Sequence, residues 1–332
     1  MQPAGRWAVA LGAGVCSSLF RAADPGGRPS IHSGTLGTVR CWVERNKRRR
    51  GLTWVDVVAV VVVLGLIGVV LLPLVGRRTS HSAGHLKDST QIRGVHQGMV
   101  IWAESHDGRY PLPSLADKGG TTIAGADDEK DTTANMISLM IFNGFISPDL
   151  CVSVAESNPA IRVFDKYQYT DPSGAADPKK ALWDPGFRAD FTTGEGNFSY
   201  AHAVLWGERK ERWRQSFDAG RPIIGNRGPE IAGVAKKKAP EVKPTLVNPK
   251  SKTLLIHGPR DTWEGNIAYD DNHVNFETSL APEGVLYKDA EKKEWRDTLF
   301  FDEADDPTGL NAMLGIVVKC GKAKEDWKLI WD

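Results

Sequence analysis

The sequence predicts an α+β protein in which a long N-terminal helix, first transmembrane and then amphipathic, packs on a small antiparallel sheet. Three observations predict this fold. The 24 residues of Leu52–Val75 carry a single charged side chain, that of Asp56. Apolar residues then recur at helical spacing as far as residue 102. Short segments rich in β-branched and aromatic residues, separated by turn residues, follow in the C-terminal half.

The apolar run Leu52–Val75 is long enough to cross a membrane. A helix of this length would extend roughly 36 Å, and the hydrocarbon core of a bilayer is about 30 Å thick. The apolar region of a secretory signal peptide is shorter, at about 7–15 residues. The run therefore predicts a single transmembrane helix, and a plain membrane anchor remains an alternative.

Charge is unevenly distributed on the two sides of this run. Residues 1–51 hold nine Lys/Arg and two Asp/Glu, a net charge of +7, whereas the chain as a whole has a net charge of only +1. This asymmetry places the N-terminus in the cytoplasm and the body of the protein outside it. The remaining residues, with a net charge of −6, lack the basic stripe of a nucleic-acid surface. No nucleic-acid partner is expected.

The helix is predicted to continue beyond the membrane, giving a transmembrane and stalk segment over residues 52–106. Residues at spacings of 3, 4 and 3 form one apolar face: Ile92, Val95, Met99 and Trp102. The sequence His106-Asp-Gly108 is a helix stop signal, and Pro111 follows it. An apolar face outside the membrane needs a cover, which a small sheet would provide.

The remaining residues, 107–332, are predicted to form this α+β head. A second helix is expected over residues 132–146, and residues 171–196 are expected to form a loop. Residues 227–252, with six lysines and four prolines, are interpreted as a flexible loop, with a basic docking arm as the alternative. Strands are predicted over residues 197–206, 253–257, 265–269, 273–277, 314–320 and 327–331.

The junction between the basic segment and the apolar run contains a specific motif. The basic cluster that begins at Arg45 ends at Gly51, and Asp56 is the fifth residue after this glycine. Pro73 is the twenty-second residue after it. This arrangement resembles the processing site of type IV prepilins and type II secretion pseudopilins. A lone acid at the mouth of an apolar helix is costly, which supports a specific role for Asp56.

The resemblance implies a processing and assembly pathway. A prepilin peptidase would remove the leader, residues 1–51, by cutting after Gly51, and Leu52 would be N-methylated. Asp56 would pair with the N-terminal amine of a neighbouring subunit, and Pro73 occupies a position where many pilins carry proline. The implied partners are the peptidase, other pilin or pseudopilin subunits and an inner-membrane assembly platform. The implied location is the inner membrane, as a single-pass protein with a periplasmic head, and then a filament.

Two further stretches resemble the same family. Residues 91–111 resemble the segment that follows the membrane helix in pseudopilins of the G type. Residues 265–276, which contain Asp270, Asp271 and His273, resemble the C-terminal hairpin of some prepilin-type proteins. Together these resemblances imply a structural subunit of a type II secretion pseudopilus or a type IV pilus-like filament. The alternative is an uncleaved single-span protein whose outer domain binds a ligand or protein.

The remaining chemistry of the sequence is sparse. Phosphate-loop, dinucleotide-binding and metalloprotease motifs are not found, so no enzymatic activity is expected. Asp270 and Asp271 could bind calcium, or could be turn residues chosen for their backbone geometry. Acidic runs at 127–129 and 302–306 are alternative calcium loops. Cys151 and Cys320 could form a disulfide outside the cytoplasm, or could be buried thiols.

Overall fold

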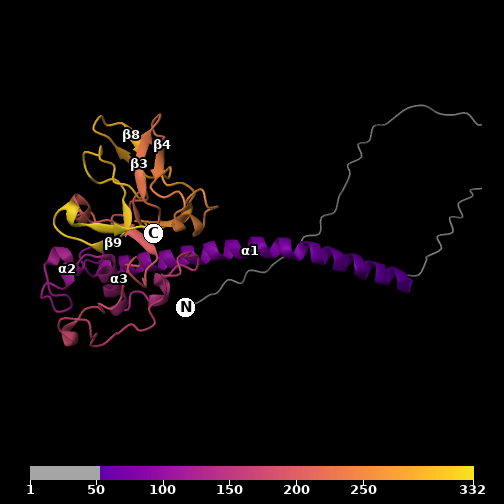
Figure 1. The fold of residues 1–332 in the computed structure, drawn as a ribbon, viewed down its shortest axis with the longest axis horizontal. Coiled ribbons are helices and arrows are strands. Elements are labelled where there is room, and N and C mark those ends of the chain that lie inside the picture. The colour runs from indigo at the N-terminus through magenta and orange to yellow at the C-terminus, as the bar shows by residue number, and fades with distance from the viewer. Residues whose placement is uncertain (1–52) are drawn as a thin grey trace, which may run out of the picture. The chain divides into compact units, whose positions relative to one another are not determined.

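The computed structural model describes residues 53–332, with the side chains of residues 68–83 left undescribed. The chain divides into two compact units, residues 1–61 and residues 62–332. The described part of the first unit is the beginning of helix α1 (Trp54–Glu104), which continues into the second unit (Figure 1). The predicted leader, residues 1–51, lies outside the described residues.

Helix α1 corrects the transmembrane prediction. Among the residues that the structure describes, none of the helices is long and apolar enough to cross a membrane. The predicted transmembrane helix Leu52–Val75, the single-pass inner-membrane placement and the pilin-type description that depended on the span are therefore not supported.

The second unit is rich in β-structure. Its main sheet has six strands in the order β10-β9-β1-β2-β5-β6, and every neighbouring pair is antiparallel. The strands of this sheet are β1 (Tyr200–Ala203), β2 (Pro222–Asn226), β5 (Gly265–Tyr269), β6 (Val274–Glu277), β9 (Leu314–Lys319) and β10 (Lys328–Ile330). Two separate hairpins are formed by β3 (Ile231–Lys236) with β4 (Val242–Leu246), and by β7 (Leu286–Lys288) with β8 (Glu294–Arg296).

Short helices complete the unit within the described residues. Helix α3 begins after Thr132, whose hydroxyl accepts a hydrogen bond from the backbone N–H of Asn135, a typical N-cap contact. The helices are α2 (Pro113–Ala116), α3 (Thr133–Phe142), and the 3-10 helices η1 (Asp127–Glu129), η2 (Pro148–Cys151), η3 (Pro178–Lys180), η4 (Gly207–Lys210), η5 (Lys252–Leu255) and η6 (Lys324–Asp326).

The predicted fold class is therefore wrong for the head of the protein as well as for the transmembrane helix. The small sheet is replaced by ten strands in three sheets within residues 53–332. The flexible loop predicted over 227–252 is instead the β3–β4 hairpin, in which Ile231 pairs with Leu246. Pro244 is tolerated because a two-stranded hairpin leaves one side of each strand without a ladder partner. The strand predicted at 253–257 is the 3-10 turn η5, where the Ser251 side chain accepts a hydrogen bond from the N–H of Thr253.

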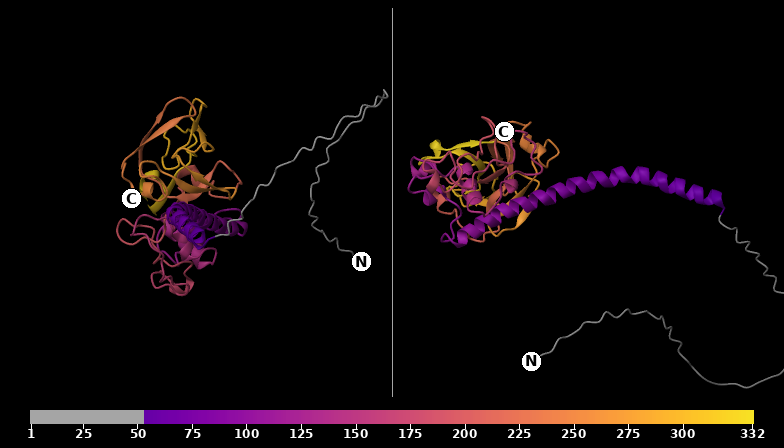
Figure 2. Two further views of the ribbon diagram at one scale, coloured as in Figure 1. Left: turned by 90° about the vertical axis from the view of Figure 1, so that its right-hand side faces the viewer. Right: turned by 90° about the horizontal axis from the view of Figure 1, so that it is seen from below.

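The C-terminal part of α1 belongs to the core of the second unit. Its residues Ile92, Val95 and Met99 are completely buried, as the apolar periodicity predicts. They share one core cluster with α3, through Met136, and with the main sheet, through Ile224. In Figure 2 this end of α1 lies between the strand-rich segments, coloured orange and yellow, and the magenta segment that contains α3. The helix is thus covered on both sides.

Candidate functional site

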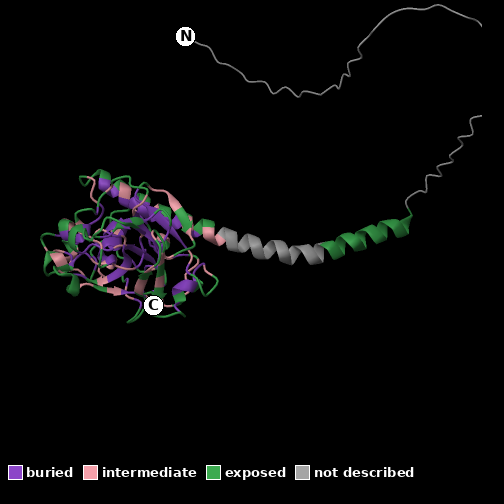
Figure 3. Cartoon of the chain, turned by 90° about the horizontal axis from the view of Figure 1, so that it is seen from above, coloured by how far each residue is buried: buried purple, intermediate pink, exposed green. Residues whose placement is uncertain are grey.

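The N-terminal part of α1 exposes large apolar side chains at most of its positions. We call residues Trp54–Ile67 the apolar segment; its start is exposed and its charge is limited to Asp56 (Figure 3). The exposed fraction is 81% for Trp54, 56% for Val60 and 63% for Leu66. The other large exposed side chains are Val55, Val57, Val58, Val61, Val62, Val63, Leu64 and Ile67. Contiguous apolar surface of this kind marks an interaction site.

Asp56 lies in the first turn of α1 and is held there by Thr53. Its Oδ2 accepts hydrogen bonds from the backbone N–H of Thr53, at 2.9 Å, and from the Thr53 hydroxyl, at 2.6 Å. These two bonds lower the pKa of Asp56, so the carboxylate is ionised at neutral pH. An anion here is also favoured by the positive end of the helix dipole. Asp56 thus presents a fixed negative charge at the start of the apolar segment.

The other residues predicted for processing and assembly cannot be placed in the same way. Gly51 and Leu52 lie outside the described residues. Pro73 is within α1, but its side chain is not described. The predicted cut, the methylation and the role of Pro73 therefore stay predictions.

A buried polar cluster attaches α1 to the head. Asp88, on α1, is completely buried, and its carboxylate accepts hydrogen bonds from three partners. His257 Nε2 is 2.9 Å away and Asn266 Nδ2 is 2.7 Å away, and the hydroxyl of Ser153 bonds to the other oxygen. Burial alone would raise the pKa of Asp88, but these hydrogen bonds outweigh burial and lower the pKa. The cluster is thus an ionised carboxylate enclosed by donors.

This cluster contains Ser, His and Asp but lacks the order of a nucleophilic triad. His257 bonds to Asp88, and Ser153 bonds to the same carboxylate rather than to the imidazole. In a triad the histidine lies between the other two and takes the proton of the serine. The observed order instead suits a structural contact that joins α1 to β5 and to the segments that follow η2 and η5.

Asp88 was missed by the sequence analysis, although the sequence contains a signal for it. It precedes Ile92 by four residues and therefore lies on the same face of the helix as the buried apolar row. A carboxylate on a buried face needs partners. His257, Ser153 and Asn266 carry no sequence signal that would connect them to α1.

A second set of contacts connects α1 with the β5–β6 hairpin. His96 Nδ1 is 3.0 Å from the side-chain oxygen of Asn272, and His96 Nε2 is 3.3 Å from the hydroxyl of Tyr110. Asn272 is in the left-handed region, with φ of 68°, which Asn tolerates better than most residues. The predicted strands 265–269 and 273–277, and the turn between them, are confirmed. The turn serves as a contact for α1.

Asp270 is placed in a way that disfavours the calcium alternative. It is 1% exposed, and its two oxygens already accept five hydrogen bonds or ion-pair contacts. The donors are the hydroxyl of Tyr110 at 2.6 Å, the N–H and hydroxyl of Ser216, both at 2.7 Å, the N–H of Asp218 at 3.2 Å and the guanidinium of Arg221 at 2.8 Å. A calcium ion would have to displace these donors.

The other candidate calcium ligands are also engaged or dispersed. Asp271 contacts the ring of His273 next to it, and Asp127 forms an ion pair with Lys130. Asp302 pairs with Arg209 and Lys324. Among the described side chains of residues 53–67 and 84–332, no group of three or more His, Cys, Asp or Glu is arranged to hold a metal ion. Calcium binding therefore stays an untested prediction without a preformed site in the described part of the chain.

The two cysteines of the head are free thiols. Cys151 is 0% exposed and Cys320 is 1% exposed, and neither forms a disulfide. They lie in different apolar clusters, Cys151 with the α1 face and Cys320 with Val317. Burial raises the pKa of the Cys320 thiol to about 12, so it is protonated and unreactive at neutral pH. The alternative of buried thiols is thus the one observed.

A buried acid pair lies in the last loop before β9. Burial, together with the charge of Asp302, raises the pKa of Glu303 to about 7, although hydrogen bonds from Thr298 oppose the shift. Burial and the charge of Glu303 also raise the pKa of Asp297 well above its usual range, while the charge of Arg209 opposes this shift. Two carboxyls this close and this buried share protons rather than ionise together.

The raised pKa of Glu303 predicts a pH-dependent stability. A carboxyl whose pKa is 4.5 in the unfolded chain and about 7 in the folded protein binds more protons when folded. The free energy of unfolding should therefore be highest below pH 4.5 for this group and should fall as the pH rises to about 7. Glu303→Gln should remove this loss, measured by urea unfolding at pH 5 and pH 8. Glu104→Gln, an exposed carboxyl change, is the control, and an unaltered pH profile for Glu303→Gln would contradict the prediction.

Comparison of the chain with protein-family models, with curated proteins and with solved structures finds no match.

Proposed function

We propose that the protein is a non-catalytic structural subunit of a filament, assembled through the apolar segment of α1. The observation that carries this proposal is the row of eleven large apolar side chains between Trp54 and Ile67 that are 41–81% exposed. Fully burying one such side chain contributes about 1.5–3 kcal/mol. Covering the whole row would contribute on the order of 10 kcal/mol before the costs of association.

The occupant that best suits this surface is the same segment of another copy. Valine predominates in the segment. A helix surface that is apolar and uncharged can pack against an identical helix through any of its faces. Such packing gives cohesion but little register. A single fixed charge in each copy, Asp56, supplies register when it meets one cation per copy. The amine of an N-terminus at Leu52 is a cation of this kind, only a few residues away in sequence.

The contacts of Asp88 and His96 support the same proposal. Both side chains attach α1 to strands and loops of the head by hydrogen bonds. A subunit that assembles through one end of a helix can position its head only if the other end of that helix is firmly held. Cutting after Gly51, N-methylation of Leu52 and the choice between a type II secretion pseudopilus and a type IV pilus-like filament remain predictions of the sequence resemblance.

The test of processing is N-terminal mass spectrometry of the full chain co-expressed with a prepilin peptidase. The expected product begins at N-methyl-Leu52. Gly51→Ala is the matched variant and should remain uncut, because prepilin peptidase cuts after glycine in the type IV prepilins that this junction resembles. A wild-type chain that keeps an intact N-terminus in the presence of the active peptidase would refute the processing step and would favour a protein that is never cut.

A further inference from the structure

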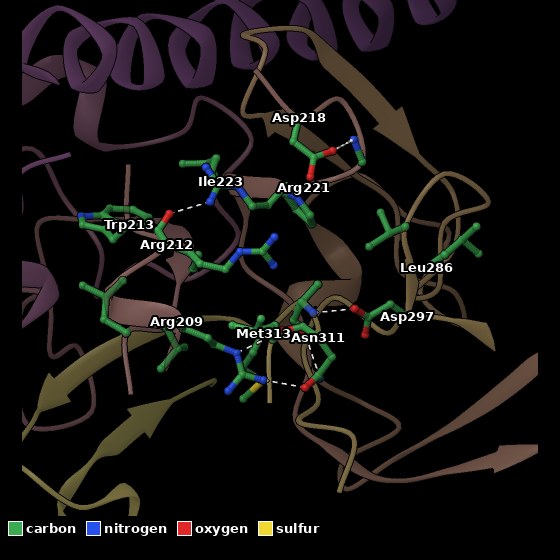
Figure 4. Close-up of a pocket in the computed structure, with 18 residues that line it drawn as sticks. Arg209, Arg212, Trp213, Asp218, Arg221, Ile223, Leu286, Asp297, Asn311 and Met313 are labelled. Carbon is green, nitrogen blue, oxygen red and sulfur yellow. Dashed lines mark hydrogen bonds between the residues drawn. The ribbon is translucent and has the colours of Figure 1, made fainter. Parts of the chain in front are cut away.

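A cavity of about 130 Å³ lies in the head, apart from α1 and its contacts. Its walls come from the end of β1 and the loop after it, the segment leading into β2, the start of β7 and the residues before β9. Apolar side chains form part of the lining, among them Leu205, Ile223 and Leu286. The cavity thus combines an apolar wall with the charged groups described next (Figure 4).

Three arginines line the cavity, and their surroundings differ. Arg209 is already bonded to Asp302 and Asn311. Arg221 uses its terminal nitrogens on Asp270 and on two backbone carbonyls. The guanidinium of Arg212 forms no hydrogen bond or ion pair with any described residue, and Figure 4 shows it extending toward the middle of the lining side chains. Arg212 is exposed, and its positive charge has no counterion in the described part of the chain.

Two buried polar atoms of lining residues also lack partners within residues 53–332. They are Nε of Arg221, a donor, and Oδ1 of Asp297. Asp297 is 2% exposed, and its other oxygen accepts the backbone N–H of Ala312. Buried polar atoms without partners are rare and costly in native proteins, and a bound molecule is one way to satisfy them. An unused donor and an unused carboxyl oxygen thus belong to residues that line the same cavity as Arg212.

We propose that this cavity binds a small organic monocarboxylate, with its carboxylate on Arg212 and Arg221 and its carbon chain on the apolar wall. The fork of donors in a guanidinium matches the two oxygens of a carboxylate. Burial and the neighbouring charge of Glu303 raise the pKa of Asp297, which favours the neutral form of this carboxyl. It donates a hydrogen bond to the bound anion instead of repelling it. Asp218, exposed at the rim, bonds to the N–H of Gly220.

The size of the cavity restricts the carbon chain. An engineered cavity of about 150 Å³ holds benzene. A cavity of about 130 Å³ therefore accommodates a chain of about four carbons. A ligand of this size binds with a dissociation constant of roughly millimolar. Butyrate is the probe that fits these limits, and butyramide has nearly the same shape without the charge.

The test is calorimetric titration of the full chain with butyrate and with butyramide. Wild type should bind butyrate at least tenfold more tightly than butyramide. Arg212→Gln should weaken butyrate binding about tenfold or more, because charge-assisted hydrogen bonds are lost. Its melting temperature should stay unchanged, because the Arg212 side chain has no bonded partner among the described residues. Arg188→Gln, an exposed arginine outside the cavity, is the matched control and should bind butyrate as wild type does.

Three results would overturn the proposal. They are no detectable butyrate binding to wild type at millimolar butyrate, equal affinity of wild type for butyrate and butyramide, and an affinity of Arg212→Gln for butyrate equal to that of wild type. None of them bears on the filament proposal, because the cavity and the apolar segment share no residue.

Discussion

Val60→Asp should abolish assembly of the protein into filaments. Val60 lies in the middle of the apolar segment and is 56% exposed, so the change leaves the fold of the head intact. In a filament the same position is covered by another copy, and a carboxylate buried there without a partner costs several kcal/mol. Because each subunit meets several neighbours, we expect pelleted filament to fall more than tenfold. Ultracentrifugation and negative-stain electron microscopy of cells that express the assembly machinery measure this.

Val247→Asp is the matched control for this experiment. Val247 follows β4 and is 53% exposed, close to the value for Val60. The chemical change is identical, but the position lies outside the apolar segment. Filaments should form normally with Val247→Asp. If both variants assembled, or if both failed, the apolar segment would not be the assembly surface.

Asp88→Ala should lower the free energy of unfolding by about 3–5 kcal/mol, the cost of removing one partner from a buried charged contact. His257, Asn266 and Ser153 would each lose the acceptor of a hydrogen bond. Urea unfolding of the full chain followed by circular dichroism measures the change. Asp165→Ala, which removes an exposed carboxylate, should cost less than about 0.5 kcal/mol. A loss below 1 kcal/mol for Asp88→Ala would show that the cluster does not hold the helix.

The pH dependence of the same contact provides a second measurement. The pKa of Asp88 is lowered in the folded protein, from an ordinary value of 3.8. The folded state therefore binds fewer protons, and this contribution to stability is present above pH 4 and is lost as the pH falls through the folded pKa. The difference in stability between wild type and Asp88→Asn should be present at pH 5. It should become smaller below pH 4.

Local patterns in the sequence predicted part of this fold. The alternation and turn residues around Asp270 predicted β5 and β6, since both strands and their turn are determined within a dozen residues. The helix predicted at 132–146 is found as Thr133–Phe142, and the strands predicted near the C-terminus are found as β9 and β10. The apolar face of Ile92 and Val95 also lies in the core, as predicted.

The missed elements have identifiable physical causes. Strand β2 is only five residues long and contains a proline and a glycine, so its propensity is weak and its pairing with β1 and β5 determines it. The β3–β4 hairpin was not predicted because it is rich in lysines and prolines, which are depleted in strands and enriched in linkers. Strands β7 and β8 have three residues each, too few to show a period. In all three cases tertiary pairing outweighs local preference.

The candidate sites also differ in whether the sequence alone could reveal them. Asp56 was recognised because it is the single charge in an apolar run, a property that sequence alone displays. The cavity proposed to bind a monocarboxylate could not be predicted, because Arg212, Arg221 and Asp297 come from separate segments that meet only in the folded chain. Lone arginines and aspartates are ordinary surface residues until their neighbours are known.

The distance along the chain between Asp88 and its partners affects the order of events during synthesis. His257 and Asn266 follow Asp88 by 169 and 178 residues. A ribosome adding about 5–20 residues per second needs roughly 10–40 s to make the intervening chain. During this interval the N-terminal helix is already made, whereas the head that holds it is incomplete. The proposed recognition of the Gly51 junction and the apolar segment can therefore precede folding of the head, so the proposed processing and folding need not compete for the same stretch of chain.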